Sequence, residues 1–258
     1  MSDVSRLAAL FAEARRPVVF TGAGVSTESG IPDFRSPGGV WARFDPAEFT
    51  YQNFVGSAEG RRRYWALGRT TYPVIRAATP NAAHRALAEL HRLGRLDCCI
   101  TQNIDNLHQR AGLPSASVIE LHGNATRARC LECGAPCTRD ELHARLERGV
   151  DVPDCPACGG IVKPHTILFG EAMPKEAVEE AARRAGAADL FVVLGSSLAV
   201  YPAAYMPIHA KRAGATLAIV NLEPTRADAQ ADLVIRAGAG PVMAAVADAM
   251  RARIPQRG

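Results

Sequence analysis

The sequence predicts an α/β protein with a doubly wound, mostly parallel Rossmann-like sheet and a smaller part formed by two insertions. Short apolar runs repeatedly lead into polar loops and then into helical patterns, which is typical of parallel strands joined by crossover helices. Two Cys-x-x-C pairs and an aromatic-rich stretch interrupt this pattern and predict a zinc ribbon and a helical cap. The expected division places residues 1–44, 79–126 and 163–258 in the Rossmann-like part, residues 45–78 in the cap and residues 127–162 in the zinc ribbon.

The first strand is expected at residues 18–20 (Val-Val-Phe), after an amphipathic helix within residues 1–16. The strand leads into Gly22, Ala23 and Gly24. Glycines at the carboxyl end of a parallel strand are typical of a site for a nucleotide's phosphates. Taken by itself, the segment is also compatible with an ordinary glycine-rich turn between a strand and a helix.

The glycine pattern argues against hydride transfer. The dehydrogenase fingerprint is G-x-G-x-x-G/A, and an acid follows a second strand about 20 residues later. Gly22 and Gly24 match the first two positions, but Thr27 stands at the third. Glu48 lies near the required distance and follows no apolar run. The segment therefore predicts a nucleotide site of another kind.

Further strands are expected to bring polar residues to the same edge of the sheet. Short apolar runs predict strands at residues 98–101, 118–121, 190–194, 217–220 and 233–235. Helices are expected from Pro80-Asn81 to Gly94, from Pro174 to Gly186 and from Pro241 onward. The residues expected at the site are Gln102, Asn103, Ile104 and Asp105, then His122, then Gly195, Ser196 and Ser197, and finally Asn221, Leu222 and Glu223. On position alone, a histidine such as His122 is more often structural than catalytic.

Four cysteines form the strongest metal signal in the chain. Cys130 and Cys133 form one pair, Cys155 and Cys158 form the other, and 21 residues separate the pairs. Each Cys-x-x-C turn can direct two thiolates at one tetrahedral Zn²⁺, and four sulfurs leave no open position for catalysis. We therefore expect a structural zinc ion, with a redox dithiol as the alternative. Cys137 falls outside the pattern.

Residues 45–72 are rich in aromatic side chains and predict short helices that cap the nucleotide site. Packing of an ordinary insert is the alternative for any one of these aromatics. The formal net charge of +4 gives no reason to expect nucleic acid as the main partner. Neither a secretory signal nor a membrane span is expected, which favours the cytoplasm. Thiols stay reduced there, so the seven cysteines suggest metal binding or chemistry before disulfides.

Several motifs together resemble the sirtuins, the NAD-consuming protein-lysine deacylases. They are GAGVSTESGIPDFR, TQNID, HG, the two C-x-x-C pairs, FGE, GSSL and NLEPT, in the sirtuin order and over residues 17–238. The chain looks like a compact bacterial-type sirtuin. The resemblance implies that an acyl group is removed from lysine with NAD as a reactant, which yields nicotinamide, free lysine and an O-acyl-ADP-ribose.

The resemblance also implies roles for individual residues. His122 would be the general base, and Asn103 would order water and the ribose. Ile104 and Asp105 would hold the nicotinamide carboxamide, and Gln102 would contact a ribose hydroxyl. The backbone of Gly22, Ala23 and Gly24 would approach the phosphates. The remaining expected NAD contacts are Asp33, Phe34, Arg35, Gly195, Ser196, Ser197, Asn221, Leu222 and Glu223. The acyl-lysine channel would be bordered by Val162, Phe169, Gly170, Glu171, Val200 and Tyr201.

The partner implied is an acylated-lysine protein or peptide, and a monomer is favoured while the oligomeric state stays open. The Tyr-x-x-Arg pair of sirtuins that remove succinyl and malonyl groups is missing, since Tyr64 and Arg69 are five apart and Tyr72 and Arg76 are four apart. Acetyl and other neutral acyl groups are therefore expected. A protein ADP-ribosyltransferase on the same fold and a non-catalytic NAD-sensing module are the alternatives, and His122 counts against both.

Overall fold

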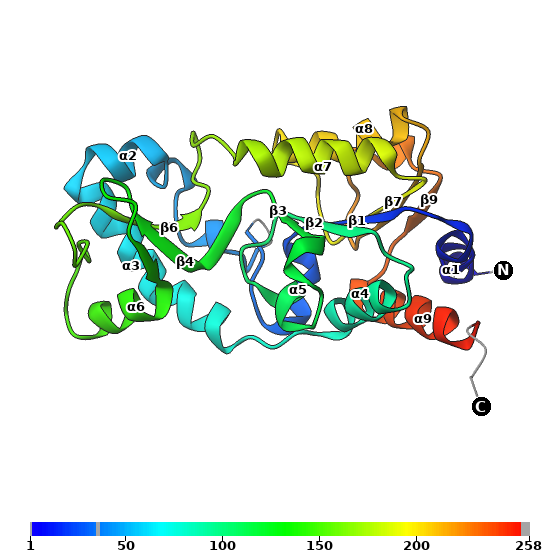
Figure 1. The fold of residues 1–258 in the computed structure, drawn as a ribbon, viewed down its shortest axis with the longest axis horizontal. Helices are drawn as coiled ribbons and strands as arrows, with labels where there is room; N and C mark the ends of the chain where they lie inside the picture. The colour runs from blue at the N-terminus through cyan, green and yellow to red at the C-terminus, as the bar shows by residue number, and fades with distance from the viewer. Residues whose placement is uncertain (1, 35–36, 254–258) are drawn as a thin grey trace.

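The computed structural model describes residues 2–34 and 37–253 of the 258-residue chain. Six strands form one parallel sheet in the order β3-β2-β1-β7-β8-β9 (Figure 1). Their bounds are β1 Pro17–Thr21, β2 Cys98–Thr101, β3 Val118–Glu120, β7 Leu190–Leu194, β8 Thr216–Val220 and β9 Leu233–Ile235. The central strand β1 pairs Val19 with Cys99 of β2 and with Val192 of β7. The predicted parallel, doubly wound sheet is confirmed.

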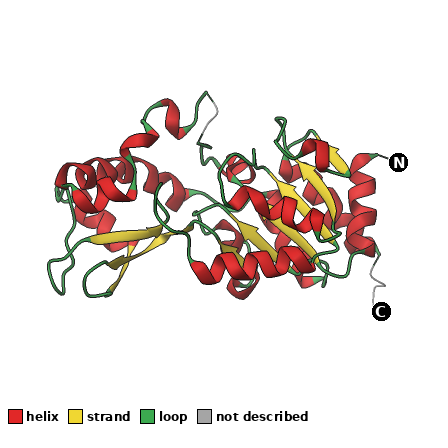
Figure 2. Cartoon of the chain, turned by 90° about the horizontal axis from the view of Figure 1, so that it is seen from above, coloured by secondary structure: helices red, strands yellow, loops and turns green. Residues whose placement is uncertain are grey.

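Helices cover both faces of this sheet, as Figures 1 and 2 show. One face carries α1 (Asp3–Glu13), α4 (Ala82–Arg92) and α9 (Ala239–Ala252), and the other carries α7 (Lys175–Ala187) and α8 (Met206–Arg212). Strand β1 is buried along its whole length: Val19 belongs to the first core, and Val18 and Phe20 belong to the second. An apolar run without alternation is what a strand covered on both faces requires.

A second sheet is antiparallel, with the order β5-β4-β6. It comprises β4 (Gly123–Cys130), β5 (Pro136–Thr138) and β6 (Val162–Thr166), and lies at the end of the molecule away from both termini (Figure 2). Trp65 of α3 (Ala58–Ala77) and Leu142 and Leu146 of α6 (Arg139–Glu147) pack beneath it. The short helix α2 (Tyr51–Gly56) precedes α3, and α5 (Leu107–Arg110) follows β2.

Two features of this smaller part differ from the expectation. The cap is dominated by α3, a helix of 20 residues that contains Pro73, instead of by short helices only. Gly68 and Pro73 disfavour a helix, but Trp65 and Tyr72, seven residues apart on one face, are both buried and outweigh that preference. The expected boundaries after residues 126 and 162 fall inside β4 and β6, which pair with each other.

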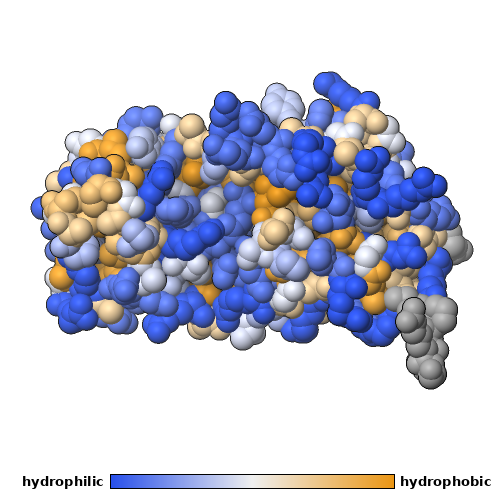
Figure 3. Space-filling model, in the orientation of Figure 1, coloured by the Kyte–Doolittle hydropathy of each residue, from blue (hydrophilic) through white to orange (hydrophobic). Residues whose placement is uncertain are grey.

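On the face shown in Figure 3, hydrophilic residues cover most of the area and hydrophobic residues appear in small separate groups. Among the helices in the described ranges, none combines the length and the apolar composition needed to cross a bilayer.

Candidate active site

The loops after β1 and β7 touch backbone to backbone at the carboxyl edge of the sheet. Gly24 N–H donates to Gly195 O over 2.8 Å, and Gly22 N–H donates to Leu194 O over 3.1 Å. A Cβ at Gly195, where φ is +56°, would lie 2.4 Å from the backbone nitrogen of Val25. Strand order reverses between β1 and β7, and such a switch point is where α/β sheets bind ligands.

These contacts leave fewer backbone N–H groups for a phosphate than the sequence predicts. The N–H groups of Gly22 and Gly24 already donate within the protein, and the two glycines serve the site because their missing side chains let the two loops approach each other. Within the described residues, the N–H groups of Ala23, Ser196 and Ser197 have no hydrogen-bond acceptor. Free backbone donors at this edge suit an anion such as a diphosphate, so the site fits NAD.

A hydrogen-bonded chain connects the loops after β1 and β2. The Asn103 side-chain amide donates to Gly22 O over 3.0 Å and to Ser26 Oγ over 3.1 Å. Ser26 in turn donates to Asp105 Oδ2 over 2.7 Å, and Leu107 N–H donates to the other carboxylate oxygen over 2.8 Å. The buried Asp105 therefore fixes the loop that carries Asn103. Ser26, which links the two side chains, was not predicted as a site residue.

A second, fully buried chain lies beneath this loop. Thr21 donates to Thr101 over 2.8 Å, and Thr101 accepts the backbone N–H of Asn103 over 3.0 Å. Because the Thr21 hydroxyl proton is used in this way, the Thr21 oxygen accepts from His108 Nε2 over 2.9 Å. Burial lowers the pKa of His108 to about 4, so this imidazole is neutral at pH 7. These three residues were also not predicted as part of the site.

His122 follows β3 and lies beside the same loop. Its Nδ1 is 3.1 Å from Gln102 O, and a carbonyl can only accept, so Nδ1 carries the proton and Nε2 keeps a free lone pair. Burial lowers the pKa of His122 below its ordinary value of 6.5, and the hydrogen bond to the Gln102 carbonyl opposes that shift. The imidazole is therefore neutral at pH 7 and can accept a proton at Nε2. The Gln102 side chain donates to Ser196 Oγ over 2.9 Å.

The remaining expected NAD residues lie in loops at or beside this edge. Asp33 O accepts the N–H of Val40 over 2.9 Å, Phe34 is exposed, and Arg35 lies outside the described residues. After β8, the Asn221 side chain donates to Glu223 O over 2.7 Å, while Leu222 is exposed.

The expected substrate residues lie on two segments. Phe169 and Gly170 form the tip of a turn that follows β6, and Val200 and Tyr201 lie in the loop after β7. A pocket of about 480 Å³ is lined by the turn, the start of α7 and the loop after β7, with Glu171, Ala172, Met173, Lys175, Val178, Glu179 and Pro202 as its lining residues. Tyr201 and Tyr205 are exposed beside each other, with ring centroids 4.7 Å apart.

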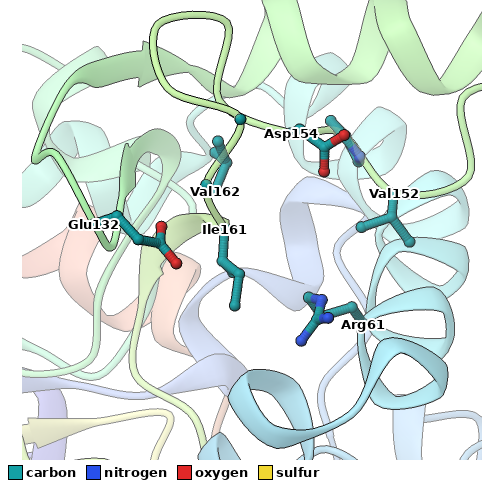
Figure 4. A pocket seen from close by; sticks show the side chains of 9 residues that line it. Arg61, Glu132, Val152, Asp154, Ile161 and Val162 are labelled. Carbon is teal, nitrogen blue, oxygen red and sulfur yellow. The ribbon is translucent and has the colours of Figure 1, made fainter.

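Val162 does not occupy the place expected for it. Its side chain is buried with Trp65 and Leu142 in the core under the small sheet. It also lines a cavity of about 250 Å³ between the start of α3 and the segment after Cys158, into which Arg61 and Ile161 point (Figure 4). A β-branched apolar residue such as Val162, upstream of Phe169-Gly170-Glu171, suits a core strand as well as a channel wall. The structure gives no support for Val162 as a substrate contact.

The four predicted metal ligands come together. The sulfurs of Cys130, Cys133, Cys155 and Cys158 all lie within 4.8 Å of one another. The Cys130–Cys158 and Cys133–Cys155 separations are 3.5 and 3.7 Å. A tetrahedral ion with Zn–S bonds of about 2.3 Å places its ligands roughly 3.8 Å apart. The cluster therefore fits one structural zinc ion, which these four thiolates would hold with no position left for a substrate.

Comparison with known proteins agrees with this geometry. The model of the Sir2 family matches residues 22–202. The NAD-dependent protein deacetylase 1 of Bradyrhizobium diazoefficiens is 49% identical over 242 residues, which cover 94% of each chain. The NAD-dependent protein deacylase 2 of Archaeoglobus fulgidus is 42% identical over 250 residues, 96% of each chain.

Solved structures share the fold along nearly the whole chain. A structure described as Sir2 with p53 peptide and NAD⁺ superposes with a TM-score of 0.87 at 38% identity and covers 96% of this chain and 98% of its own. A Sir2 variant with deacetylated p53 peptide and 3′-O-acetyl-ADP-ribose gives 0.88 at 39% identity, with 95% and 97% covered. With the predicted motifs, the zinc cluster and the site at the switch point in agreement, the chain belongs to the Sir2 family, the sirtuins.

Proposed function

We propose that this protein is an NAD-dependent protein-lysine deacylase that acts on acetyl-lysine. The observation that carries the proposal is the neutral His122, whose Nδ1 proton is held by Gln102 O and whose Nε2 is free beside the loop of Asn103 and Asp105. The relatives' names and the Sir2 complexes with peptide and NAD⁺ or 3′-O-acetyl-ADP-ribose support the same reaction.

The chain's residues divide the work of this reaction. When NAD is bound, it supplies the ribose that accepts the acyl group. Ala23, Ser196 and Ser197 would offer N–H donors to the diphosphate, and the Asn103 side chain, fixed by its hydrogen bond to Gly22 O, would face the ribose. Once nicotinamide has left the ribose and the acyl oxygen has bonded to the anomeric carbon, His122 Nε2 takes the proton of a ribose hydroxyl as that oxygen attacks the acyl carbon. The bond from the acyl carbon to the lysine nitrogen then breaks, one water is consumed, and the products are free lysine and an O-acyl-ADP-ribose. Phe34, whose side chain is exposed, would shield the reacting face.

The pocket beside the turn of Phe169 and Gly170 supports a peptide partner. Its lining includes Glu171, which follows that turn, the start of α7, and Pro202, which follows Tyr201. We infer that an extended peptide adds as a strand between the turn and the loop of Tyr201. We infer that the acyl-lysine side chain enters past Phe169 and that flanking residues of the peptide lie along the pocket.

The arrangement of the cap favours neutral acyl groups. Tyr72 OH donates to Asp140 over 3.0 Å, and Arg76 pairs with the same carboxylate at 3.2 Å. Tyr64 OH bonds to Thr166 Oγ1 over 3.0 Å. These candidates for binding an acidic acyl group all have partners within the protein, so a succinyl carboxylate would meet no free arginine from them.

We also propose the two-part division of residues 1–44, 79–126 and 163–258 against 45–78 and 127–162, with the adjustment that β4 and β6 belong together. A cytoplasmic location is part of the proposal, supported by cysteines gathered for metal instead of for disulfides.

The test is mass spectrometry of an acetyl-lysine peptide incubated with the protein, with and without NAD. Loss of the acetyl group only with NAD, together with O-acetyl-ADP-ribose, supports the proposal. Consumption of NAD with ADP-ribose attached to protein and the acetyl group untouched would instead identify an ADP-ribosyltransferase.

A further inference from the structure

A buried lysine lies beneath the turn that is expected to border the acyl-lysine channel. Lys163 on β6 is 3% exposed, and its ammonium lies 2.9 Å from Glu171 Oε2. The ammonium also donates to Thr166 O over 2.5 Å and to Pro164 O over 3.2 Å. An ammonium has three N–H donors, so each has an acceptor in the protein and none remains for a ligand.

The carboxylate that pairs with Lys163 also closes the turn. Leu168 N–H donates to Glu171 Oε2 over 2.9 Å, and Glu171 N–H donates back to Leu168 O over 3.0 Å. Phe169 and Gly170 lie at the tip, where Gly170 adopts a φ of +77°. The position of the tip therefore depends on a carboxylate held from below by a buried cation.

Further contacts connect the turn to the catalytic histidine and to the cap. Ile167 N–H donates to His122 O over 3.0 Å, directly before the turn. Tyr51 N–H at the start of α2 donates to Phe169 O over 2.9 Å. The turn thus lies between the segment of His122 and the cap, and Lys163 is the cation that holds it from the small sheet.

We propose that Lys163 is a positioning residue for deacylation: through its ion pair with Glu171 it holds Phe169 and Gly170 where the acyl-lysine chain enters. This inference rests on the proposed function. Glu171, which the family resemblance places at the channel, then acts by shaping the turn. Removing one partner of a buried pair leaves the other charge without compensation, so the turn would move to hydrate it.

The experiment compares the full-length protein with Lys163→Met, Glu171→Gln and the double variant. Glu171→Gln keeps the shape of the side chain and an acceptor for Leu168 N–H but removes the negative charge. It therefore tests the role of the ion pair even if Lys163→Met does not fold. The matched control is Lys211→Met, which breaks the ion pair between Lys211 of α8 and Asp232, the residue before β9. The readouts are the Kd of an acetyl-lysine peptide by fluorescence anisotropy, the KM of the peptide and the KM of NAD.

Each single variant is expected to raise the Kd and KM of the peptide by about tenfold, with a change in the KM of NAD below about threefold. The double variant should recover part of the loss because it leaves no unpaired charge. Lys211→Met should change none of these constants. Peptide constants that stay unchanged in the variants, or that change equally with the KM of NAD, would overturn the proposal. A wild-type protein that binds the peptide but does not deacylate it would contradict the proposed function and leave the binding test of Lys163 intact.

Discussion

The two sheets hold the two substrates' sites by different means. At the edge of the parallel sheet, the loops are fixed by backbone contacts such as Gly24 N–H to Gly195 O and by the hydrogen-bonded side chains of Asn103, Ser26 and Asp105. In the smaller part, the four cysteines and the buried Lys163–Glu171 pair fix the segment that leads to the turn of Phe169 and Gly170. The difference implies that changes in the smaller part should affect peptide use and folding, and that changes at the glycines should affect NAD.

The largest expected effect is loss of the metal. Cys155→Ser should abolish zinc binding and unfold the smaller part, because a structural Zn²⁺ contributes about 10 kcal/mol or more to the folding of a small domain that depends on it. Zinc content by mass spectrometry and peptide turnover should both be lost, while ADP-ribose binding to the parallel sheet should survive. Cys137→Ser is the matched control, since Cys137 lies outside the cluster. Loss of ADP-ribose and peptide binding together would contradict the separation of the two regions.

A smaller effect is expected at the contact between the glycine loops. Gly195→Ala places a Cβ 2.4 Å from Val25 N at a positive φ, so the loops must separate. We expect the free energy of unfolding to fall by about 2–4 kcal/mol and NAD affinity to weaken. Gly94→Ala tests backbone strain alone, because Gly94 also has a positive φ (+68°) but an added Cβ there meets nothing within 4 Å, and it should cost about 1 kcal/mol. Equal losses in the two variants, measured by denaturant unfolding, would show that loop contact is unimportant.

The pH dependence should distinguish acyl transfer, which needs His122 as a base, from nicotinamide release, which does not. His122 acts as a base only when neutral, and its pKa in the protein without substrates lies below 6.5, so kcat/KM for deacylation should change little with pH above neutrality. Below the lowered pKa, the rate should fall about tenfold per pH unit as the imidazole gains a proton. Exchange of labelled nicotinamide should lack this acid limb. A midpoint above 6.5 would contradict the assigned environment of His122.

The smallest expected effect concerns acyl preference. Tyr72→Phe removes the hydrogen bond to Asp140 and should lower the free energy of unfolding by about 1 kcal/mol. The ratio of deacetylation to desuccinylation should stay the same, because Tyr72 is already bonded away from the channel. Tyr205→Phe, at an exposed ring, is the control for loss of a phenol. A faster desuccinylation in wild type than deacetylation would reverse the proposed preference.

Local signals were enough to predict most of the parallel sheet and the helix ends. Asn81 caps α4 as its position at the start of the expected helix predicts, because its side chain accepts from backbone N–H groups within three residues of itself. Strands β2 and β7 were predicted from continuous apolar runs, which a sheet covered on both faces requires. The four zinc ligands were predicted from spacing alone, since each pair of thiols lies on one short turn.

Features that depend on distant partners were not predictable in this way. Strand β4 alternates arginine with small residues and is defined by pairing with β6, more than 30 residues later. The use of the Gly24 N–H depends on Gly195, far along the chain, and the burial of Lys163 depends on a turn that bonds back to it. Val162 was predicted to border the channel because of the motif near it in the sequence. In the structure it belongs to the core under the small sheet.

The most direct test of the account is His122→Ala, in which deacetylation of a peptide and exchange of labelled nicotinamide into NAD are both measured. We expect deacetylation to fall by about 10²–10⁴-fold while exchange persists, because nicotinamide leaves before the base is needed. Thermal unfolding should show that the variant is folded. Deacetylation at the wild-type rate, or equal loss of both reactions in a folded variant, would contradict the role of His122 as the base.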